Sequence, residues 1–217
     1  MSQQLSLQHN YRESSLSEQA PLIIMLHGYG SDENDLFSFA SELPKEYAII
    51  SLKAPHTLIP YGNAWYHIYF DAPQGKWSDE TQAIESRELI IKVIDEIISV
   101  YPIDKNNITL LGFSQGTILS FAVALSYPEK IKNVIGLSGY INKDILKEGY
   151  TKNNFNGLNV YSSHGSVDQV IPVDWARNTK PLLQSLHINC HYSEYPVGHG
   201  VSPQNFQELK EWLKKHS

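Results

Sequence analysis

Residues 108–119 are Ile-Thr-Leu-Leu-Gly-Phe-Ser-Gln-Gly-Thr-Ile-Leu, and this stretch constrains the fold more than any other part of the chain. The apolar run before Gly112 is typical of a buried strand, and the apolar run after Gly116 is typical of a buried helix. Gly-x-Ser-x-Gly also occurs by chance in loops, but here a strand precedes it and a helix follows it. Such a turn holds its serine in strained geometry with the hydroxyl exposed, and its glycines let strand and helix pack closely. We therefore predict that Ser114 is a nucleophile.

Short apolar runs alternate with helical patterns along the rest of the chain. Buried strands are predicted at 21–26, 47–52, 134–138, 158–162 and 187–195, and helices at 35–43, 79–101, 174–186 and 203–215. Asp79 and Gln82 resemble a capping box, and Pro181 predicts a break or kink. The alternation predicts parallel βαβ units in a doubly wound, mostly parallel sheet with helices on both faces. With no repeat or linker visible, we expect a single α/β domain over residues 1–217.

Composition excludes several classes of partner. The chain has 217 residues, enough for one sizeable core. Its net charge of −6 gives no support for a nucleic-acid partner. The only cysteine, Cys190, cannot form an internal disulfide. The N-terminal segment 1–20 is polar, without a signal-peptide pattern, and no apolar run approaches the ~18 residues of a transmembrane segment. We expect a soluble, cytoplasmic protein.

Residues 54–78 interrupt the alternation. The segment is long, lacks a clean period and carries the aromatic residues Tyr61, Trp65, Tyr66, Tyr69, Phe70 and Trp77. A connection of this length in a compact domain is usually functional or disordered, and its aromatic density argues against disorder. The segment either packs on the body to shield the sheet or forms a wall over the site that grips an apolar substrate group. Both interpretations stay open.

A serine nucleophile needs a base, and the base needs an orienting carboxylate. After a strand–turn–helix nucleophile, the partners are expected in the chain order serine, acid, histidine, each in a loop after a later strand. Asp168 follows the strand predicted at 158–162, and His199 follows the strand predicted at 187–195. We predict that His199 is the base and Asp168 the acid.

Other carboxylates and histidines compete for these roles. Asp174 is expected in the first turn of a helix, and Asp144 in an exposed, lysine-rich stretch. His27 and His164 precede glycines at strand ends, where a histidine is more often a hydrogen-bonded support of the loop. A metal site is a further alternative, built from His27, His164, His199 and Asp168. The chain has no paired ligand spacing such as HExxH or CxxC, so we expect no metal and no cofactor.

The developing oxyanion needs hydrogen-bond donors. In this arrangement, one donor is the backbone N–H after the nucleophile, that of Gln115, and the other comes from the loop after an early strand. The glycine-rich residues 26–31 form such a loop, and we favour the N–H of Tyr29. Losing one such donor typically costs ~10²–10³ in turnover. We expect Gly28, Trp65 and Tyr66 to bind the substrate.

Four motifs then carry a resemblance to a known family. They are Leu-His-Gly-Tyr-Gly at 26–30, Gly-Phe-Ser-Gln-Gly at 112–116, His-Gly-x-x-Asp-x-Val-Ile-Pro at 164–172 and Gly-His-Gly at 198–200. Together they resemble the phospholipase/carboxylesterase family of α/β-hydrolases, which includes acyl-protein thioesterases and small bacterial carboxylesterases. The resemblance implies a Ser114–His199–Asp168 triad, Tyr29 and Gln115 as oxyanion donors, no cofactor, and medium-sized acyl esters or thioesters as small-molecule substrates. Residues 69–77 differ from the acyl-protein thioesterase version of this loop, which favours a bacterial-type carboxylesterase.

The expected reaction is a two-step acyl transfer. An ordinary imidazole titrates near ~6.5, so a histidine base predicts that activity falls below about pH 6–7. Two other functions remain open: a receptor that keeps the triad but turns over slowly, and a serine peptidase of the same fold. An apolar rim around the site would serve dimerisation as well as substrate access, so a homodimer also remains open.

Overall fold

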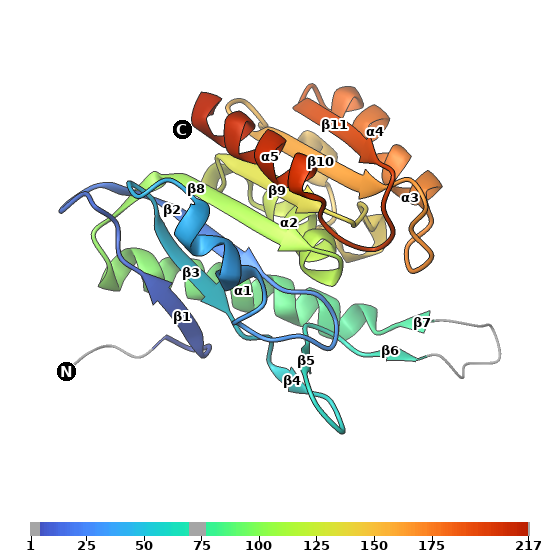
Figure 1. Cartoon of the computed structure of the whole chain (residues 1–217), viewed down its shortest axis with the longest axis horizontal. Helices are drawn as coiled ribbons and strands as arrows, with labels where there is room; N and C mark the ends of the chain where they lie inside the picture. Colours follow the sequence, from blue (N-terminus) through green and yellow to red (C-terminus); the bar gives the residue numbers. More distant parts are fainter. Residues whose placement is uncertain (1–4, 70–76, 217) are drawn as a thin grey trace.

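The structure is a computed structural model that describes residues 5–69 and 77–216. Its main sheet contains the strands β1 (His9–Arg12), β2 (Ala20–Leu26), β3 (Ala48–Leu52), β8 (Ile103–Phe113), β9 (Asn133–Leu137), β10 (Asn159–Gly165) and β11 (Asn189–Tyr195). Their order across the sheet is β1-β3-β2-β8-β9-β10-β11 (Figure 1). β1 pairs with β3 in antiparallel fashion, and the other neighbours pair in parallel. The predicted doubly wound, mostly parallel sheet is confirmed.

Helices cover both faces of this sheet. The α-helices are α1 (Glu80–Val100), α2 (Gln115–Ser126), α3 (Val173–Arg177), α4 (Thr179–Ser185) and α5 (Pro203–Lys215). The 3₁₀ helices are η1 (Leu36–Glu42), η2 (Pro128–Lys130), η3 (Lys143–Ile145) and η4 (Tyr150–Lys152). In Figure 1, α5 lies in front of the sheet, and α1 and α2 lie behind it.

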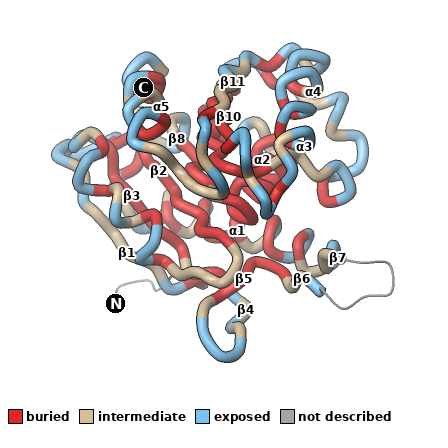
Figure 2. The backbone as a smooth tube through the Cα atoms, turned by 45° about the vertical axis from the view of Figure 1, so that its right-hand side comes forward, coloured by how far each residue is buried: buried red, intermediate tan, exposed pale blue. Residues whose placement is uncertain are grey.

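Alternate side chains of the central strands belong to two separate hydrophobic cores, one on each face of the sheet. Successive residues of a strand point to opposite faces. Ile24 packs with Ile94 of α1 and Phe121 of α2. Its neighbour Ile23 packs in the other cluster with Leu209 of α5. Figure 2 shows the central strands largely buried, and β2, β3 and β9 are buried at every residue. This two-sided burial explains why the strands are continuous apolar runs rather than alternating ones.

The topology places the loops after β2 and β8 side by side. From β2 the chain steps outward to β3, whereas from β8 it steps in the opposite direction to β9, β10 and β11. The carboxyl ends of β2 and β8 therefore flank the point where the winding reverses, and Leu26 pairs with Gly112 there. In open α/β sheets, ligands bind outside the strand ends at this reversal.

The long helices α5 and α1 both begin at a polar cap, and the capping box predicted for Asp79 and Gln82 is confirmed in part. Ser202 accepts a hydrogen bond from the backbone of Asn205 at 3.1 Å, and Pro203 is the first residue of α5. Asp79 accepts from the backbone of Gln82 at 3.0 Å. The Gln82 side chain, however, accepts from the backbone of His67 at 3.0 Å, so it ties residues 54–78 to α1.

Two predicted helices differ from the structure. The helix expected at 174–186 is divided into α3 and α4 at Asn178, three residues before Pro181. Pro181 thus lies in the first turn of α4, where a missing N–H costs nothing. Residues 36–42 form the 3₁₀ helix η1 rather than an α-helix.

The N-terminal segment contains the edge strand β1, which the sequence analysis did not predict. Its residues are all half-buried and show no apolar alternation. Arg12 at its end donates to the carbonyl oxygens of Leu43 at 3.0 Å and Tyr47 at 2.7 Å. Backbone pairing with β3 and these side-chain bonds hold the strand, and neither leaves a periodic signal in the sequence.

The described residues of the segment 54–78 form two short antiparallel strand pairs, one at the bottom and one at the lower right of Figure 1. β4 (His56–Thr57) pairs with β5 (Asn63–Ala64), and β6 (Ile68–Tyr69) pairs with β7 (Trp77–Ser78). Ile59 and Tyr61 at the tip between β4 and β5 are 98% and 80% exposed. Phe70, one of the aromatic residues noted in the sequence, lies outside the described residues. Among the described helices, none is both long and apolar enough to cross a bilayer.

Candidate active site

Ser114 lies between the end of β8 and the start of α2, at the reversal point of the sheet. Its φ of 52° and ψ of −114° place it in a backbone region that non-glycine residues rarely adopt. The Ser114 N–H donates to the carbonyl oxygen of Leu137 at 2.8 Å. A Cβ built on Gly116 would lie 1.9 Å from the Leu26 carbonyl oxygen, so only glycine allows α2 to approach β2 this closely. The predicted strained backbone of this turn is confirmed. Residues 112–116 are here called the nucleophile elbow, after the role that the sequence predicts for Ser114.

His199 lies in the loop between β11 and α5 and faces the serine. Its Nε2 is 2.9 Å from the Ser114 Oγ, within hydrogen-bond distance. The ring packs against Phe113, with the two ring centroids 5.0 Å apart. Its side chain is 18% exposed, so it borders the open side of the site.

Asp168 lies in the loop after β10, on the far side of His199 from the serine. Its Oδ2 is 2.7 Å from the His199 Nδ1. Its Oδ1 accepts the backbone N–H groups of Val170 at 2.8 Å and Ile171 at 3.0 Å. Burial acts to raise the pKa of this carboxyl, but the His199 and backbone hydrogen bonds outweigh burial and lower it below its ordinary value. Asp168 is therefore a buried carboxylate, bound to His199 on one oxygen and to its own loop on the other.

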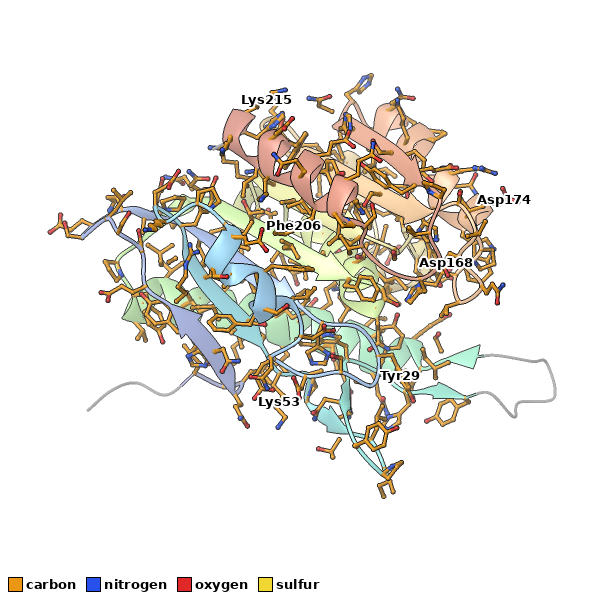
Figure 3. The ribbon with its side chains drawn as sticks, in the orientation of Figure 1. Tyr29, Lys53, Asp168, Asp174, Phe206 and Lys215 are labelled. Carbon is orange, nitrogen blue, oxygen red and sulfur yellow. The ribbon has the colours of Figure 1, made fainter. Side chains whose placement is uncertain are left out.

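The competing acids lie elsewhere. Asp174 is in the first turn of α3, 2.9 Å from Arg177 and largely exposed. In Figure 3, Asp174 lies farther out than Asp168, at the edge of the molecule. Asp144 is exposed in η3, at the rim of the cavity described below. Neither carboxylate is within ion-pair distance of a histidine among the described residues.

His27 supports the loop after β2, as its position at a strand end predicts. Its Nδ1 donates to the Gly28 carbonyl oxygen at 2.8 Å, and its Nε2 accepts the Ala54 N–H at 3.1 Å. Burial lowers the pKa of this imidazole, which agrees with one donor and one acceptor nitrogen. Both nitrogens are used by backbone groups. In residues 5–69 and 77–216, no three His, Cys, Asp or Glu side chains are grouped so that they could hold a metal ion.

The two predicted oxyanion donors come from different elements, and both residues line the cavity beside Ser114 that is described below. Gln115 is the first residue of α2, directly after the serine. Figure 3 shows Tyr29 on the loop after β2, at the same edge of the sheet as Asp168. A Cβ built on Gly28 would lie 3.4 Å from the Ser114 Cβ, which places this loop against the nucleophile. The loop is fixed from outside, because the Gly30 N–H donates to the Asn63 carbonyl oxygen at 2.9 Å.

A cavity of about 1000 Å³ opens in front of Ser114 and His199. Its apolar wall comes from several elements and includes Tyr66, Ile68, Ile118, Tyr140, Ile141, Ile171, Trp175 and Leu182. Its rim carries both signs of charge and includes Glu80, Lys143 and Asp144. The rings of Tyr140 and Trp175 meet edge to face with centroids 5.0 Å apart. The cavity is thus suited to a largely apolar group beside Ser114.

The side chain of Gln115, which the sequence analysis did not single out, holds residues 65 and 66 in place. Its Oε1 accepts the Trp65 N–H at 2.9 Å, and its Nε2 donates to the Tyr66 carbonyl oxygen at 2.8 Å. Both functional ends of the amide are therefore used by adjoining peptide groups. The signal that the sequence offered for this role is a polar side chain directly after Ser114, at the junction of an apolar strand and an apolar helix.

Of the three residues predicted to bind substrate, Tyr66 lines the cavity, Gly28 lies against the nucleophile, and Trp65 does neither. The Trp65 side chain is fully buried, and its indole N–H donates to the His27 carbonyl oxygen at 3.0 Å. The assignment of Trp65 to substrate binding is corrected here: it supports the loop after β2. Its indole packs inward because a large ring gains most from full burial when its N–H also finds an acceptor.

A mostly parallel sheet with a serine elbow after β8, a carboxylate after β10 and a histidine after β11 defines an α/β-hydrolase. The sequence profile of the Phospholipase/Carboxylesterase family matches residues 8–217. The chain belongs to this family.

Individual relatives are distant but cover most of the chain. The "Probable carboxylesterase SOBER1-like" of Arabidopsis thaliana is 30% identical over 155 residues, which are 68% of this chain and 58% of that protein. Acyl-protein thioesterase 1 of Candida albicans is 28% identical over 212 residues, 88% of this chain and 90% of that protein. The crystal structure of the Bacillus cereus carboxylesterase superposes with a TM-score of 0.84 at 20% identity and covers 98% of this chain and 95% of that one. This structural similarity shows that the chain has the same fold as that carboxylesterase.

Proposed function

We propose that this protein is a serine hydrolase that cleaves carboxylic esters or thioesters of short-to-medium acyl chains through an acyl-enzyme intermediate. One observation carries the proposal: an unbroken line of short contacts runs from Asp168 through His199 to Ser114, and it ends at the cavity. The names of the relatives, carboxylesterase and acyl-protein thioesterase, support ester and thioester bonds as the target.

In the first half-reaction, the His199 Nε2 takes the proton of the Ser114 hydroxyl while the Oγ attacks the substrate carbonyl carbon. The new C–O bond forms as the carbonyl π electrons move to oxygen, and the resulting oxyanion is held by the backbone N–H groups of Gln115 and Tyr29. Asp168 accepts a hydrogen bond from the His199 Nδ1, which leaves Nε2 free to act as the base and stabilises the imidazolium once it forms.

The tetrahedral intermediate then collapses. The His199 Nε2–H donates its proton to the leaving alcohol or thiol as the bond to the carbonyl carbon breaks, which leaves the acyl group on Ser114. In the second half-reaction, a water molecule gives a proton to His199 and attacks the same carbon. Collapse of that intermediate returns the proton to Ser114 and releases the carboxylic acid.

The cavity supports the size and polarity proposed for the substrate. Its volume of about 1000 Å³ lies at the upper end of small-molecule sites. The wall beside the serine is apolar, with Ile118 from α2 and Ile171 and Leu182 from the opposite side. Charge at the rim is mixed, so the wall rather than a fixed charge is expected to select substrates.

A chain-length series of p-nitrophenyl esters, from acetate to octanoate, tests the proposal. The wild-type protein should hydrolyse them with one length optimum, and Ser114→Ala should lower kcat by up to ~10⁶-fold. Slow turnover of every ester by folded wild-type protein would favour the alternative function, a receptor that keeps the triad but turns over slowly. Cleavage of aminoacyl amides without cleavage of esters would favour the peptidase.

A further inference from the structure

His164 occupies a buried position beside the acid of the triad, and the mechanism above does not use it. It is the penultimate residue of β10, and its side chain has no solvent exposure. The neighbouring residue in the parallel register is Glu194 of β11. His164 therefore lies at the end of β10, next to the loop that carries Asp168.

One ring nitrogen of His164 contacts two acceptors. Its Nε2 is 2.9 Å from the Ile171 carbonyl oxygen and 3.2 Å from the Asp168 Oδ2. A carbonyl or carboxylate oxygen can only accept, so Nε2 must carry the proton. The other nitrogen, Nδ1, is buried without a hydrogen-bond partner among the described residues. His164 thus donates to the Ile171 carbonyl oxygen, and the same N–H lies within ion-pair distance of the Asp168 carboxylate.

These contacts complete the environment of the Asp168 carboxylate. Its Oδ1 accepts from the backbone of Val170 and Ile171, and its Oδ2 faces both His199 and His164. Three hydrogen-bond donors thus reach the carboxylate, and the His164 Nε2 lies 3.2 Å from its Oδ2. Because His164 donates to the Ile171 carbonyl and lies against the carboxylate, it ties the turn 168–171 to β10.

We propose that His164 is a positioning residue for the hydrolytic reaction, which sets the direction of the Asp168 carboxylate and shares its Oδ2 with His199. The inference rests on the proposed function. Without this donor, the buried carboxylate can rotate away from His199, and its Oδ2 loses a partner that draws on its negative charge. A displacement of about 1 Å in a catalytic group can cost ~10² in rate.

The charges around His164 predict a specific change in the pH dependence of kcat/KM when this residue is replaced. The groups that face His164 are Asp168 on its own loop, His199 beyond that carboxylate, and Glu194 on β11. Glu194 is already held by Arg177 through two contacts of 2.8 Å. Loss of the His164 donor concentrates negative charge on Oδ2, which favours the protonated form of the catalytic imidazole. The acid limb of kcat/KM should then move to higher pH.

Two variants of similar volume separate positioning from packing. His164→Leu removes the donor, whereas His164→Gln keeps an N–H in the region of the original Nε2. We expect His164→Leu to lower kcat by ~10–100-fold with KM changed less than about threefold. The acid limb should shift upward in this variant, and His164→Gln should restore most of kcat and the original acid limb.

Thermal melting identifies the folded variants, and fluorophosphonate labelling counts their active sites. Wild-type kcat and pH profile in His164→Leu would overturn the inference, as would equal losses in folded Leu and Gln variants. If the Leu variant does not fold, retained activity in the Gln variant supports the inference and its loss overturns it. Absence of labelling in the wild-type protein would instead count against the proposed function itself.

Discussion

The nucleophile elbow and residues 54–78 border the same cavity, but they are held in place in opposite ways. The elbow is fixed by steric contact: Gly112 and Gly116 lie where any Cβ would meet backbone atoms at 2.5 Å or less. In the segment 54–78, residues 65–67 are fixed by the side chains of Gln115 and Gln82, which bind their peptide groups. The steric constraint on the elbow can be recognised from a short sequence motif. The hydrogen bonds to residues 65–67 come from side chains far away in the sequence, so no local motif reveals them.

This difference predicts that changes in the triad and elbow are severe, and that changes around residues 54–78 are graded. The largest effect is expected for Asp168→Asn, which keeps the shape of the side chain but places an amide beside the His199 Nδ1. The imidazole is then held in the wrong tautomer, and kcat should fall by ~10⁴-fold. Ester hydrolysis by the folded variant checks this, and a loss below tenfold would contradict the assigned role.

Gly116→Ala tests the steric part of the comparison. Its Cβ would lie 1.9 Å from the Leu26 carbonyl oxygen, so β2 and α2 must separate. We expect the free energy of unfolding to fall by more than about 3 kcal/mol. Gly200→Ala is the matched control, because no heavy atom lies within 4 Å of a Cβ built there, and its effect should stay within about 0.5 kcal/mol. Equal denaturant midpoints for the two variants would refute the steric account.

Gln115→Met tests whether the Gln115 side chain holds residues 65 and 66 in place. The variant leaves the Trp65 N–H and the Tyr66 carbonyl oxygen unpaired in a buried setting, and we expect a loss of about 2–3 kcal/mol in unfolding free energy. The backbone N–H of residue 115 is retained, so kcat on a short ester should change less than KM on a long one, whose acyl group touches Tyr66. Unchanged stability together with an unchanged KM would show that the amide does not hold this wall.

Trp65→Phe separates support from substrate binding. Loss of the indole N–H leaves the His27 carbonyl oxygen without that donor. Stability should fall by about 1–2 kcal/mol, while KM along the ester series should stay within about twofold. A KM increase confined to long esters, in a variant of wild-type stability, would return Trp65 to the substrate site.

The smallest predicted effect is a change in the free energy of unfolding at acid pH. The pKa of Asp168 is lower in the folded protein than its ordinary value, so the ionised carboxylate contributes stability above the unfolded-state pKa of about 3.9. That contribution disappears as pH falls through the lower, folded-state pKa. The stability difference between the wild-type protein and Asp168→Asn should therefore narrow below about pH 4. Denaturation curves at several acid pH values measure it, and a constant difference down to acid unfolding would contradict the cited shift.

The sequence was sufficient where structure is dictated locally. Buried strands such as β2 are continuous apolar runs, α5 begins at an ordinary cap, and the elbow has a steric pattern that few other turns share. The triad residues could be chosen because their loops follow the parallel strands β8, β10 and β11 in the expected chain order. The structure brings the Ser114 and Asp168 side chains within hydrogen-bond distance of His199.

The rest depended on tertiary contacts. β1 has no periodicity, because one edge pairing and the Arg12 side chain hold it. The separation of α3 from α4 occurs at Asn178, not at the proline that predicted it. Trp65 could not be distinguished from Tyr66 by sequence, since both are aromatic and only the fold decides which one faces the cavity. A cytoplasmic location, a homodimer and the absence of a nucleic-acid partner stay predictions.

Reaction with a fluorophosphonate probe, followed by peptide mass spectrometry, tests the central claim most directly. If the line from Asp168 through His199 activates the serine, the wild-type protein will carry one phosphonyl adduct, on Ser114. His199→Ala should react far more slowly, and Ser114→Ala should not react at all. No adduct on folded wild-type protein, or an adduct on another residue, would contradict the assignment of Ser114 as the nucleophile.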